Sequence, residues 1–189
     1  MSPRVTEIAY DSVMGVVRMA IDVAEWDRQP ASAPGDGVAP FEVIPLVWGE
    51  ERSRALAAAV AASCGLRPAG FLTECASRPG RWVHGWGAVV PCEKAPPAPA
   101  EPDPQAGFAG VILLLESTPS GPGAPRCSIP WLLVRPESRR LGVGRALVAA
   151  ALGHAKGHGA RRVSIDTLDR WPEAVAFWGG IGFQCISSE

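Results

Sequence analysis

The sequence predicts a sheet with helices on its faces, of the α+β or α/β class, and three observations support this. Short apolar runs alternate with segments of helical periodicity from residue 41 onward. The order is strand, helix, three strands, helix, strand, helix and strand, which is typical of a sheet flanked by helices. Hydrophobic residues make up 47% of the 189 residues and charged residues 20%, an ordinary balance for a globular domain with a sizeable core.

The first 38 residues are expected to form an N-terminal extension, and residues 39–189 the main domain. Apolar residues in Ser12–Trp26 recur at helical spacing, so we expect an amphipathic helix there. This helix would pack on the main domain or on a partner. The following stretch, QPASAPGDG, has the composition of a linker.

The main domain contains apolar runs of strand character, interrupted by loops rich in Pro and Gly. Residues 93–106 contain too many prolines for a helix or a central strand, so we expect an exposed loop or a hairpin insertion. Pro130 interrupts an apolar run and indicates a bulge or break, because proline cannot donate to a sheet ladder. The expected strands are 41–47, 81–90, 107–116, 127–134, 163–168 and 182–186, and the expected helices are 50–63, 145–156 and 172–179.

Composition argues against several classes of function. The formal net charge of -1 gives no general attraction to nucleic acid or to acidic membranes. The longest apolar stretches are too short to span a membrane, and no signal peptide is recognisable. The five cysteines show no CxxC pair and no Cys/His ligand spacing, so we expect reduced thiols, a cytoplasmic protein and no metal site. His154 and His158 flank the end of an expected helix, and we interpret them as solvated side chains.

The segment RPESRRLGVG, residues 135–144, joins an expected strand to an expected helix. A helix N-terminus exposes unpaired N–H groups and about half a positive charge. Gly142 and Gly144 allow a ligand close to these amides, and Arg139, Arg140 and Arg145 add positive charge. The loop is neither a Walker loop nor a dinucleotide fingerprint. It therefore indicates either a phosphate or pyrophosphate site or a plain turn with basic residues.

Two motifs in this order resemble those of the GNAT superfamily. Val134 to Leu147, V-x-P-x-x-R-R-x-G-V-G-R-A-L, is similar to the acetyl-CoA signature R/Q-x-x-G-x-G/A, with Arg139, Gly142 and Gly144 at the fixed positions. Residues 174–183 are similar to the family's helix-and-strand element A-x-x-φ-Y-x-x-x-G-F, where φ is apolar. The resemblance covers about residues 127–183. It implies a GNAT-like mixed, mostly antiparallel sheet flanked by helices, in which two neighbouring strands splay apart to admit acyl-CoA.

The resemblance implies an N-acetyltransferase that uses acetyl-CoA and no metal. The acceptor would be a primary amine, of a small molecule or a protein, that attacks the thioester directly. No nucleic-acid or membrane partner is expected, and a homodimer is left open. The backbone of Leu132, Leu133 and Val134 would bind the pantetheine arm and the acetyl carbonyl. The pyrophosphate would lie against the loop and the first helical turn, formed by Arg139, Arg140, Leu141, Gly142, Val143, Gly144 and Arg145.

The sequence departs from the family pattern at three points. Trp178 stands where the family often has Tyr, and Trp171 where it often has Asn. The sequence ends six residues after Phe183, whereas relatives usually continue into another strand. Either that strand is missing, or the N-terminal extension or a partner supplies it. A catalytically weak or inactive GNAT-like module that binds CoA or a partner is therefore the alternative function, and half of a toxin–antitoxin pair is a third.

The general base is left open among three residues. A base must reach the attacking amine directly or through water. His84 lies on the second expected strand, which in this fold borders the acceptor site, and Glu116 closes the third. Asp166 lies on the strand after the motif helix. Trp82 and Trp86 share one face of an expected strand, where they pack in the core or form an aromatic wall for the acceptor.

Overall fold

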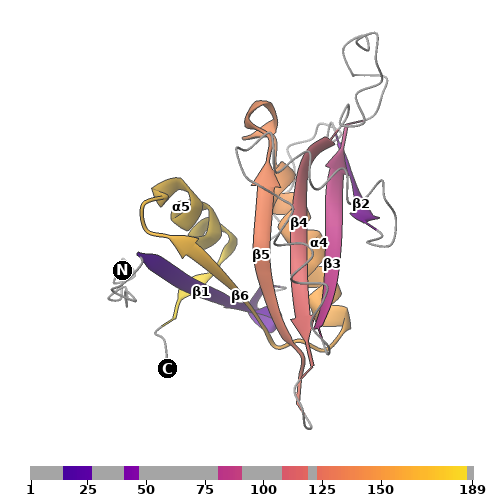
Figure 1. Ribbon diagram of the computed structural model, residues 1–189, viewed down its shortest axis with the longest axis vertical. Coiled ribbons are helices and arrows are strands. Elements are labelled where there is room, and N and C mark those ends of the chain that lie inside the picture. Colours follow the sequence, from indigo (N-terminus) through magenta and orange to yellow (C-terminus); the bar gives the residue numbers. More distant parts are fainter. Residues whose placement is uncertain (1–14, 27–40, 47–80, 91–107, 119–122, 187–189) are drawn as a thin grey trace.

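The computed structural model describes residues 15–26, 41–46, 81–90, 108–118 and 123–186, which form one seven-stranded sheet with the order β2-β3-β4-β5-β6-β1-β7 (Figure 1). All neighbouring strands are antiparallel except β5 and β6, which are parallel. The elements are β1 (Val16–Asp22), α1 (Val23–Trp26), β2 (Glu42–Leu46), β3 (Arg81–Val89), β4 (Phe108–Ser117), β5 (Arg126–Val134), the 3-10 helix η2 (Pro136–Ser138), α4 (Val143–Gly157), β6 (Arg162–Leu168), α5 (Pro172–Ile181) and β7 (Gln184–Cys185).

Most of the expected elements are confirmed to within a few residues. Each of the six expected strands corresponds to a strand between β2 and β7, and the two later helices to α4 and α5. The expected helix 50–63, the linker 29–37 and the loop 93–106 lie outside the described residues. No helix in the described part of the chain is long and apolar enough to cross a membrane.

The central strand β4 is apolar along its length because both of its faces are buried. Val111 and Leu113 belong to the core on one face, and Ile112 and Leu114 to the core on the face covered by α4. All four side chains are at most 1% exposed. Helix α4 turns the apolar stripe expected from its sequence toward this second core, through Leu147, Val148, Ala151, Leu152 and Ala155.

Strand β5 contains the irregularity that Pro130 indicates. The register pairs Leu113 with Trp131 and Leu115 with Ser128, so Ile129 and Pro130 lie opposite the single residue Leu114. This is a β-bulge, and it accommodates a proline that cannot donate to the ladder. The bulge lies just beyond the two pairs that join β5 to β6, Cys127↔Val163 and Ser128↔Ser164. Past these pairs the two strands diverge, as the resemblance implied (Figure 1).

The expected amphipathic helix at Ser12–Trp26 is wrong for residues 16–22, which form β1, and only Val23–Trp26 is helical. β1 pairs with β6 along its whole length, from Val16↔Leu168 to Asp22↔Arg162, and also with β7. Val17, Met19 and Ile21 alternate into the core at 2–3% exposure, and β-branched residues favour strands. The position of β1 agrees with the alternative in which the N-terminal extension supplies the additional strand.

Candidate functional site

The loop between β5 and α4 has an unusual backbone conformation. Arg140 has φ 66° and Gly142 has φ 81°, and Arg140 is the one non-glycine residue with positive φ in the described part of the chain. This conformation costs roughly 1–2 kcal/mol for a residue with a side chain. Hydrogen bonds from Ser138 N to Arg135 O and from Ala146 N to Gly142 O hold the two ends of the loop. Observed strain of this kind points to a functional role.

Five consecutive backbone donors are available at this loop. The N–H groups of residues 140–144 have no hydrogen-bond acceptor among the described residues. They lie at the N-terminus of α4, where the helix dipole adds partial positive charge, and the first turn contains no acidic residue. Arg139 and Arg140 are exposed beside them. The arrangement has the donors and the charge to bind a diphosphate.

Gly142 and Gly144 serve different purposes. A Cβ atom on Gly142 would have nothing within 4 Å, so this position is open toward solvent or a ligand. A Cβ atom on Gly144 would lie 3.1 Å and 3.2 Å from two ring atoms of Phe177 on α5. Gly144 therefore allows the first turn of α4 to pack closely against α5. Only Gly142 has the open surroundings that the sequence analysis expected of both.

The end of β5 leads directly into this loop. Leu132, Leu133 and Val134 pair with β4 on one side, whereas the ladder to β6 ends at Ser128. Among the described strands, none pairs with the other edge of residues 132–134. Arg139 Nε donates to Val134 O at 3.4 Å, which links the loop to the strand. The residues expected to bind the cofactor thus follow one continuous path from β5 to the first turn of α4.

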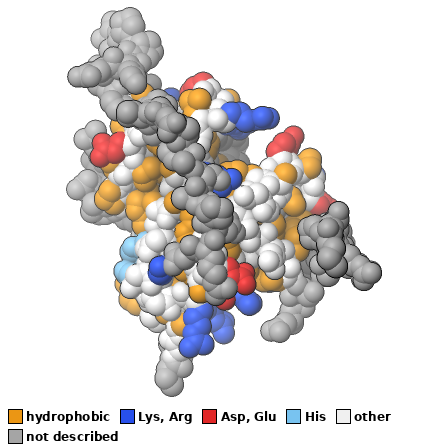
Figure 2. Space-filling model, turned by 180° about the vertical axis from the view of Figure 1, so that it is seen from behind, with side chains coloured by type: hydrophobic (Ala, Val, Ile, Leu, Met, Phe, Trp, Pro, Cys, Tyr) orange, Lys and Arg blue, Asp and Glu red, His pale blue; other side chains and the backbone are white. Residues whose placement is uncertain are grey.

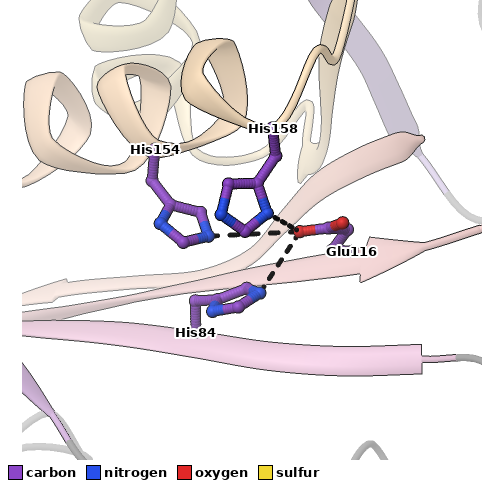
Figure 3. A group of neighbouring side chains, drawn as sticks. All are labelled: His84, Glu116, His154 and His158. Atoms are coloured by element: carbon purple, nitrogen blue, oxygen red, sulfur yellow. Dashed lines mark hydrogen bonds and ion pairs between the residues drawn. The ribbon is translucent and has the colours of Figure 1, made fainter. Parts of the chain in front are cut away.

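A second group of polar residues lies at the other end of α4. His84 on β3, Glu116 on β4, His154 on α4 and His158 at the C-cap of α4 point toward one another (Figure 3). Glu116 Oε2 lies 3.0 Å from His158 Nδ1, 3.2 Å from His84 Nε2 and 4.0 Å from His154 Nε2. We call these four residues the histidine–glutamate cluster. His154 is twelve residues after Gly142, about 18 Å along a helix, so the cluster is remote from the loop.

The interpretation of His154 and His158 as solvated helix-end residues is wrong for His154, whose side chain is 23% exposed and faces Glu116. His158 is 45% exposed, but its Nδ1 is hydrogen-bonded to the carboxylate. The four-residue spacing of these histidines, at the last turn and the C-cap of one helix, was the signal for a shared site. The other half of the cluster depends on the register that sets Trp82 opposite Glu116, and the sequence does not reveal that register.

The cluster is largely buried and incompletely hydrogen-bonded. The Glu116 side chain is 10% exposed. The Nε2 atoms of His84 and His154 are buried without a well-aligned hydrogen-bond partner, although His84 Nε2 lies 3.2 Å from Glu116 Oε2. Burial lowers the pKa of His84 and of His154 below the usual value; neighbouring histidines act in the same direction, and Glu116 opposes them. Histidine atoms are visible at the surface in Figure 2, so one side of the cluster faces solvent.

Asp166 lies apart from the other two catalytic candidates. It is on β6 and forms an ion pair with Arg18 on β1. Neither Asp166 nor the histidine–glutamate cluster contacts the loop through any hydrogen bond or ion pair among the described residues. The structure thus brings together His84 and Glu116, but not Asp166, and the catalytic role of each stays a prediction.

The tryptophans divide between core and surface. Trp178 is 7% exposed and packs edge-on against Phe177 and Phe183, with ring centroids 5.2 Å and 5.0 Å away. Trp86 packs against the core and against the ring of His154. Trp82 is 50% exposed, so core packing, the default expectation for both β3 tryptophans, holds for Trp86 alone.

Known proteins are similar to this chain in part of its sequence and in its fold. Residues 93–183 match the model of the Acetyltransferase (GNAT) family. A search of curated proteins finds no match. A tandem GNAT protein from the clavulanic acid biosynthesis pathway is 19% identical with a TM-score of 0.60, and the alignment covers 94% of this chain and 52% of that one. A GCN5-related N-acetyltransferase from Sphaerobacter thermophilus is 21% identical with a TM-score of 0.59, covering 94% and 50%.

An aminoglycoside N-acetyltransferase solved in complex with CoA is 15% identical with a TM-score of 0.55, and the alignment covers 82% of this chain and 93% of that one. The present chain thus spans about half the length of the tandem GNAT protein and most of the aminoglycoside enzyme. Its mixed seven-stranded sheet has the GNAT fold. The family match covers residues 93–183, and the likeness in fold extends over most of the chain.

Proposed function

We propose that the protein transfers an acetyl group from acetyl-CoA to a primary amine. The observation that carries this proposal is the row of available N–H groups at residues 140–144, at the N-terminus of α4. It lies at the end of a strand whose outer edge is open from Leu132 to Val134. A diphosphate on the loop would allow an extended pantetheine arm to follow this edge. The family match and the CoA-bound neighbour support the same cofactor.

Transfer would proceed by direct attack of the amine nitrogen on the thioester carbonyl carbon. A C–N bond forms, the C–S bond breaks, CoA leaves as the thiolate, and the amine nitrogen loses a proton. Backbone N–H groups on the open edge of β5 would stabilise the negative charge that develops on the carbonyl oxygen. His84, Glu116 and Asp166 remain the candidates for the proton acceptor, which acts directly or through water.

The leaving thiolate does not depend on a tyrosine at the family position. Trp178 occupies that position, is buried, and has an indole N–H that is far too weak an acid to donate a proton. Tyr10, the one tyrosine of the sequence, lies outside the described residues. A thiol has an ordinary pKa of about 8.5, so the thiolate is a competent leaving group and water can protonate it.

Binding of acetyl-CoA is tested by isothermal titration of the wild-type chain and of two variants of one residue. Gly142→Asn and Gly142→Asp introduce side chains of nearly equal size, and both tolerate positive φ. The two side chains differ in charge. If the loop binds the pyrophosphate, we expect the Kd for acetyl-CoA to be at least about tenfold higher in Gly142→Asp than in Gly142→Asn. Equal affinities in the two variants would place the diphosphate elsewhere.

Transfer is tested by the amine-dependent release of CoA thiol. The panel comprises an aminoglycoside, a polyamine and a lysine-containing peptide, because two similar structures are of an aminoglycoside acetyltransferase, one of them with sisomicin bound. Release with one class identifies the acceptor. Saturable binding of acetyl-CoA without amine-dependent release across a wide panel favours the alternative, a GNAT-like module that binds CoA or a partner without transfer. The replacement of the family tyrosine by a buried tryptophan is the observation behind that alternative.

A further inference from the structure

The histidine–glutamate cluster gathers all three histidines of the chain around one buried carboxylate. Their ligand atoms, three imidazole nitrogens and one carboxylate oxygen, all lie within 4.8 Å of one another. They come from β3, β4, α4 and the C-cap residue of α4, which the fold brings to the same point (Figure 3). A chance meeting of solvated surface groups would not leave two of the nitrogens buried.

The distances are those of a compact coordination site. Four ligands placed 2.0–2.1 Å from a zinc ion in a tetrahedron are about 3.3 Å apart. The Oε2 atom of Glu116 lies 3.0 Å, 3.2 Å and 4.0 Å from the three nitrogens. The neighbouring imidazole rings are also close, with centroids 4.1 Å apart for His84 and His154 and 4.0 Å apart for His154 and His158. Only small side-chain movements separate this arrangement from a tetrahedron.

Two buried nitrogen atoms of the cluster lack hydrogen-bond partners, which indicates that a further group belongs there. The Nε2 atoms of His84 and His154 are buried and lack a hydrogen-bond partner. Glu116 is buried, and its ion-pair partners among the described residues are these histidines alone. A buried carboxylate requires a compensating positive charge or a full set of hydrogen bonds. A cation at the centre would supply that charge and accept the lone pairs of the unpartnered nitrogens.

We propose that His84, Glu116, His154 and His158 bind one divalent transition-metal ion of the zinc type. Imidazole nitrogens with one carboxylate oxygen suit Zn²⁺, and four protein ligands form the closed arrangement of a structural site. Bound metal would fasten the C-terminal end of α4 to β3 and β4. This site is separate from the acetyl-CoA loop, and its existence does not depend on acyl transfer. If the metal binds as proposed, His84 and Glu116 are its ligands and no longer candidates for the proton acceptor.

The test uses the full chain without a histidine tag, stripped of metal with a chelator, and ZnCl₂ as the probe. Isothermal titration gives the stoichiometry, and thermal unfolding gives the dependence of Tm on zinc concentration. We expect one Zn²⁺ per chain and a Tm that rises with zinc, because a ligand that binds the folded state stabilises it. Failure of the folded chain to bind Zn²⁺ overturns the proposal.

Variants locate the ion. Glu116→Gln preserves the shape of the side chain and removes its charge, and His158→Ala changes the most exposed ligand, so both are compatible with folding. Each is expected to weaken zinc binding by at least about tenfold, the lower limit for changes made even outside the ligand shell. Glu173→Gln, an exposed carboxylate on α5, is the matched control and should bind as the wild type does. Unchanged affinity in both cluster variants would overturn the proposal.

The cysteines are the competing ligands in this chain, and Co²⁺ distinguishes them. Tetrahedral Co²⁺ gives visible absorption bands, and thiolate ligands add an intense charge-transfer band at shorter wavelength. We expect the tetrahedral bands without the thiolate band, and we expect the spectrum to persist after the accessible cysteines of the native protein are alkylated. A thiolate band, or loss of metal binding on alkylation, would assign the metal to cysteine and overturn the proposed histidine–glutamate site.

Discussion

Arg18 on β1 and Asp166 on β6 face each other across the antiparallel ladder and form a two-pronged ion pair. Arg18 Nε donates to Oδ1 of Asp166 at 2.7 Å, and Nη2 donates to Oδ2 at 3.1 Å. Both side chains are about half exposed, so solvent screens the attraction. We expect Arg18→Gln, Asp166→Asn and the double variant to give a coupling energy of about 0.2–1 kcal/mol, measured by urea unfolding. A coupling above about 2 kcal/mol would mean that the pair is more shielded than it is in the structure.

The same two variants test whether Asp166 is the general base. Each breaks the ion pair, but only Asp166→Asn removes the carboxylate. A base contributes typically about 100- to 10,000-fold to the rate. If Asp166 is that base, kcat falls by such a factor in Asp166→Asn and not in Arg18→Gln. We expect instead that the two variants have similar kcat values, because the carboxylate is committed to Arg18.

Gly144 and Gly153 lie on the same helix and should respond oppositely to alanine. At Gly144 the new methyl group would lie 3.1 Å from Phe177, so we expect Gly144→Ala to lower the free energy of unfolding by about 1–3 kcal/mol. At Gly153 nothing lies within 4 Å, so Gly153→Ala should raise it by about 0.5–1 kcal/mol through helix propensity. Chemical denaturation measures both. Equal changes in the free energy of unfolding would show that α5 does not pack closely against the first turn of α4.

Cys127 and Cys185 should differ strongly in reactivity. Cys127 is 4% exposed, and burial, followed by the charge of Glu116, raises its pKa to about 11. Cys185 on β7 is exposed. Brief alkylation of the native protein near pH 8, read by peptide mass spectrometry, should modify Cys185 and spare Cys127. Prior unfolding in urea provides the control, because both thiols then react. Rapid native labelling of Cys127 would contradict its burial.

Truncation of Ile21 tests the strand at the start of the described chain. Ile21 is 2% exposed and lies opposite Val163, so we expect Ile21→Ala to cost about 2–5 kcal/mol in urea unfolding. Val16→Ala, at the half-buried end of the same strand, should cost less. A cost below about 1 kcal/mol at Ile21 would mean that β1 is not part of the folded core in solution.

The accuracy of the sequence-based predictions follows from how local each feature is. Helix α4 and the loop before it were predicted because periodicity and motif lie in one short stretch. Pro130 indicated the bulge because proline lacks a backbone donor. β1 was mistaken for a helix because Val17, Ala20 and Ile21 are all buried, and nearly continuous burial also satisfies helical spacing.

The histidine–glutamate cluster could not be assembled from the sequence in the same way. His154 and His158 share a helix face, which is a local fact. His84 and Glu116 meet only because of the β3–β4 register, and a long connection separates the two strands along the chain. Their separate selection as acid–base candidates came from residue type and strand position. Their proximity to each other, and to both histidines at the end of α4, is a property of the fold.

The pairing of β1 with β6 has a consequence for the order of folding. Val16 and Leu168 are partners although 152 positions separate them, 168 minus 16. At roughly 5–20 residues per second of synthesis, β1 waits on the order of 7–30 s for its neighbour. During that time β1 has no β6 to pair with, and Val17, Met19 and Ile21 lack the later residues that complete their core. Contacts between residues so far apart in sequence slow folding. The nascent chain therefore exposes an apolar, aggregation-prone segment until the last part of the sheet is synthesised.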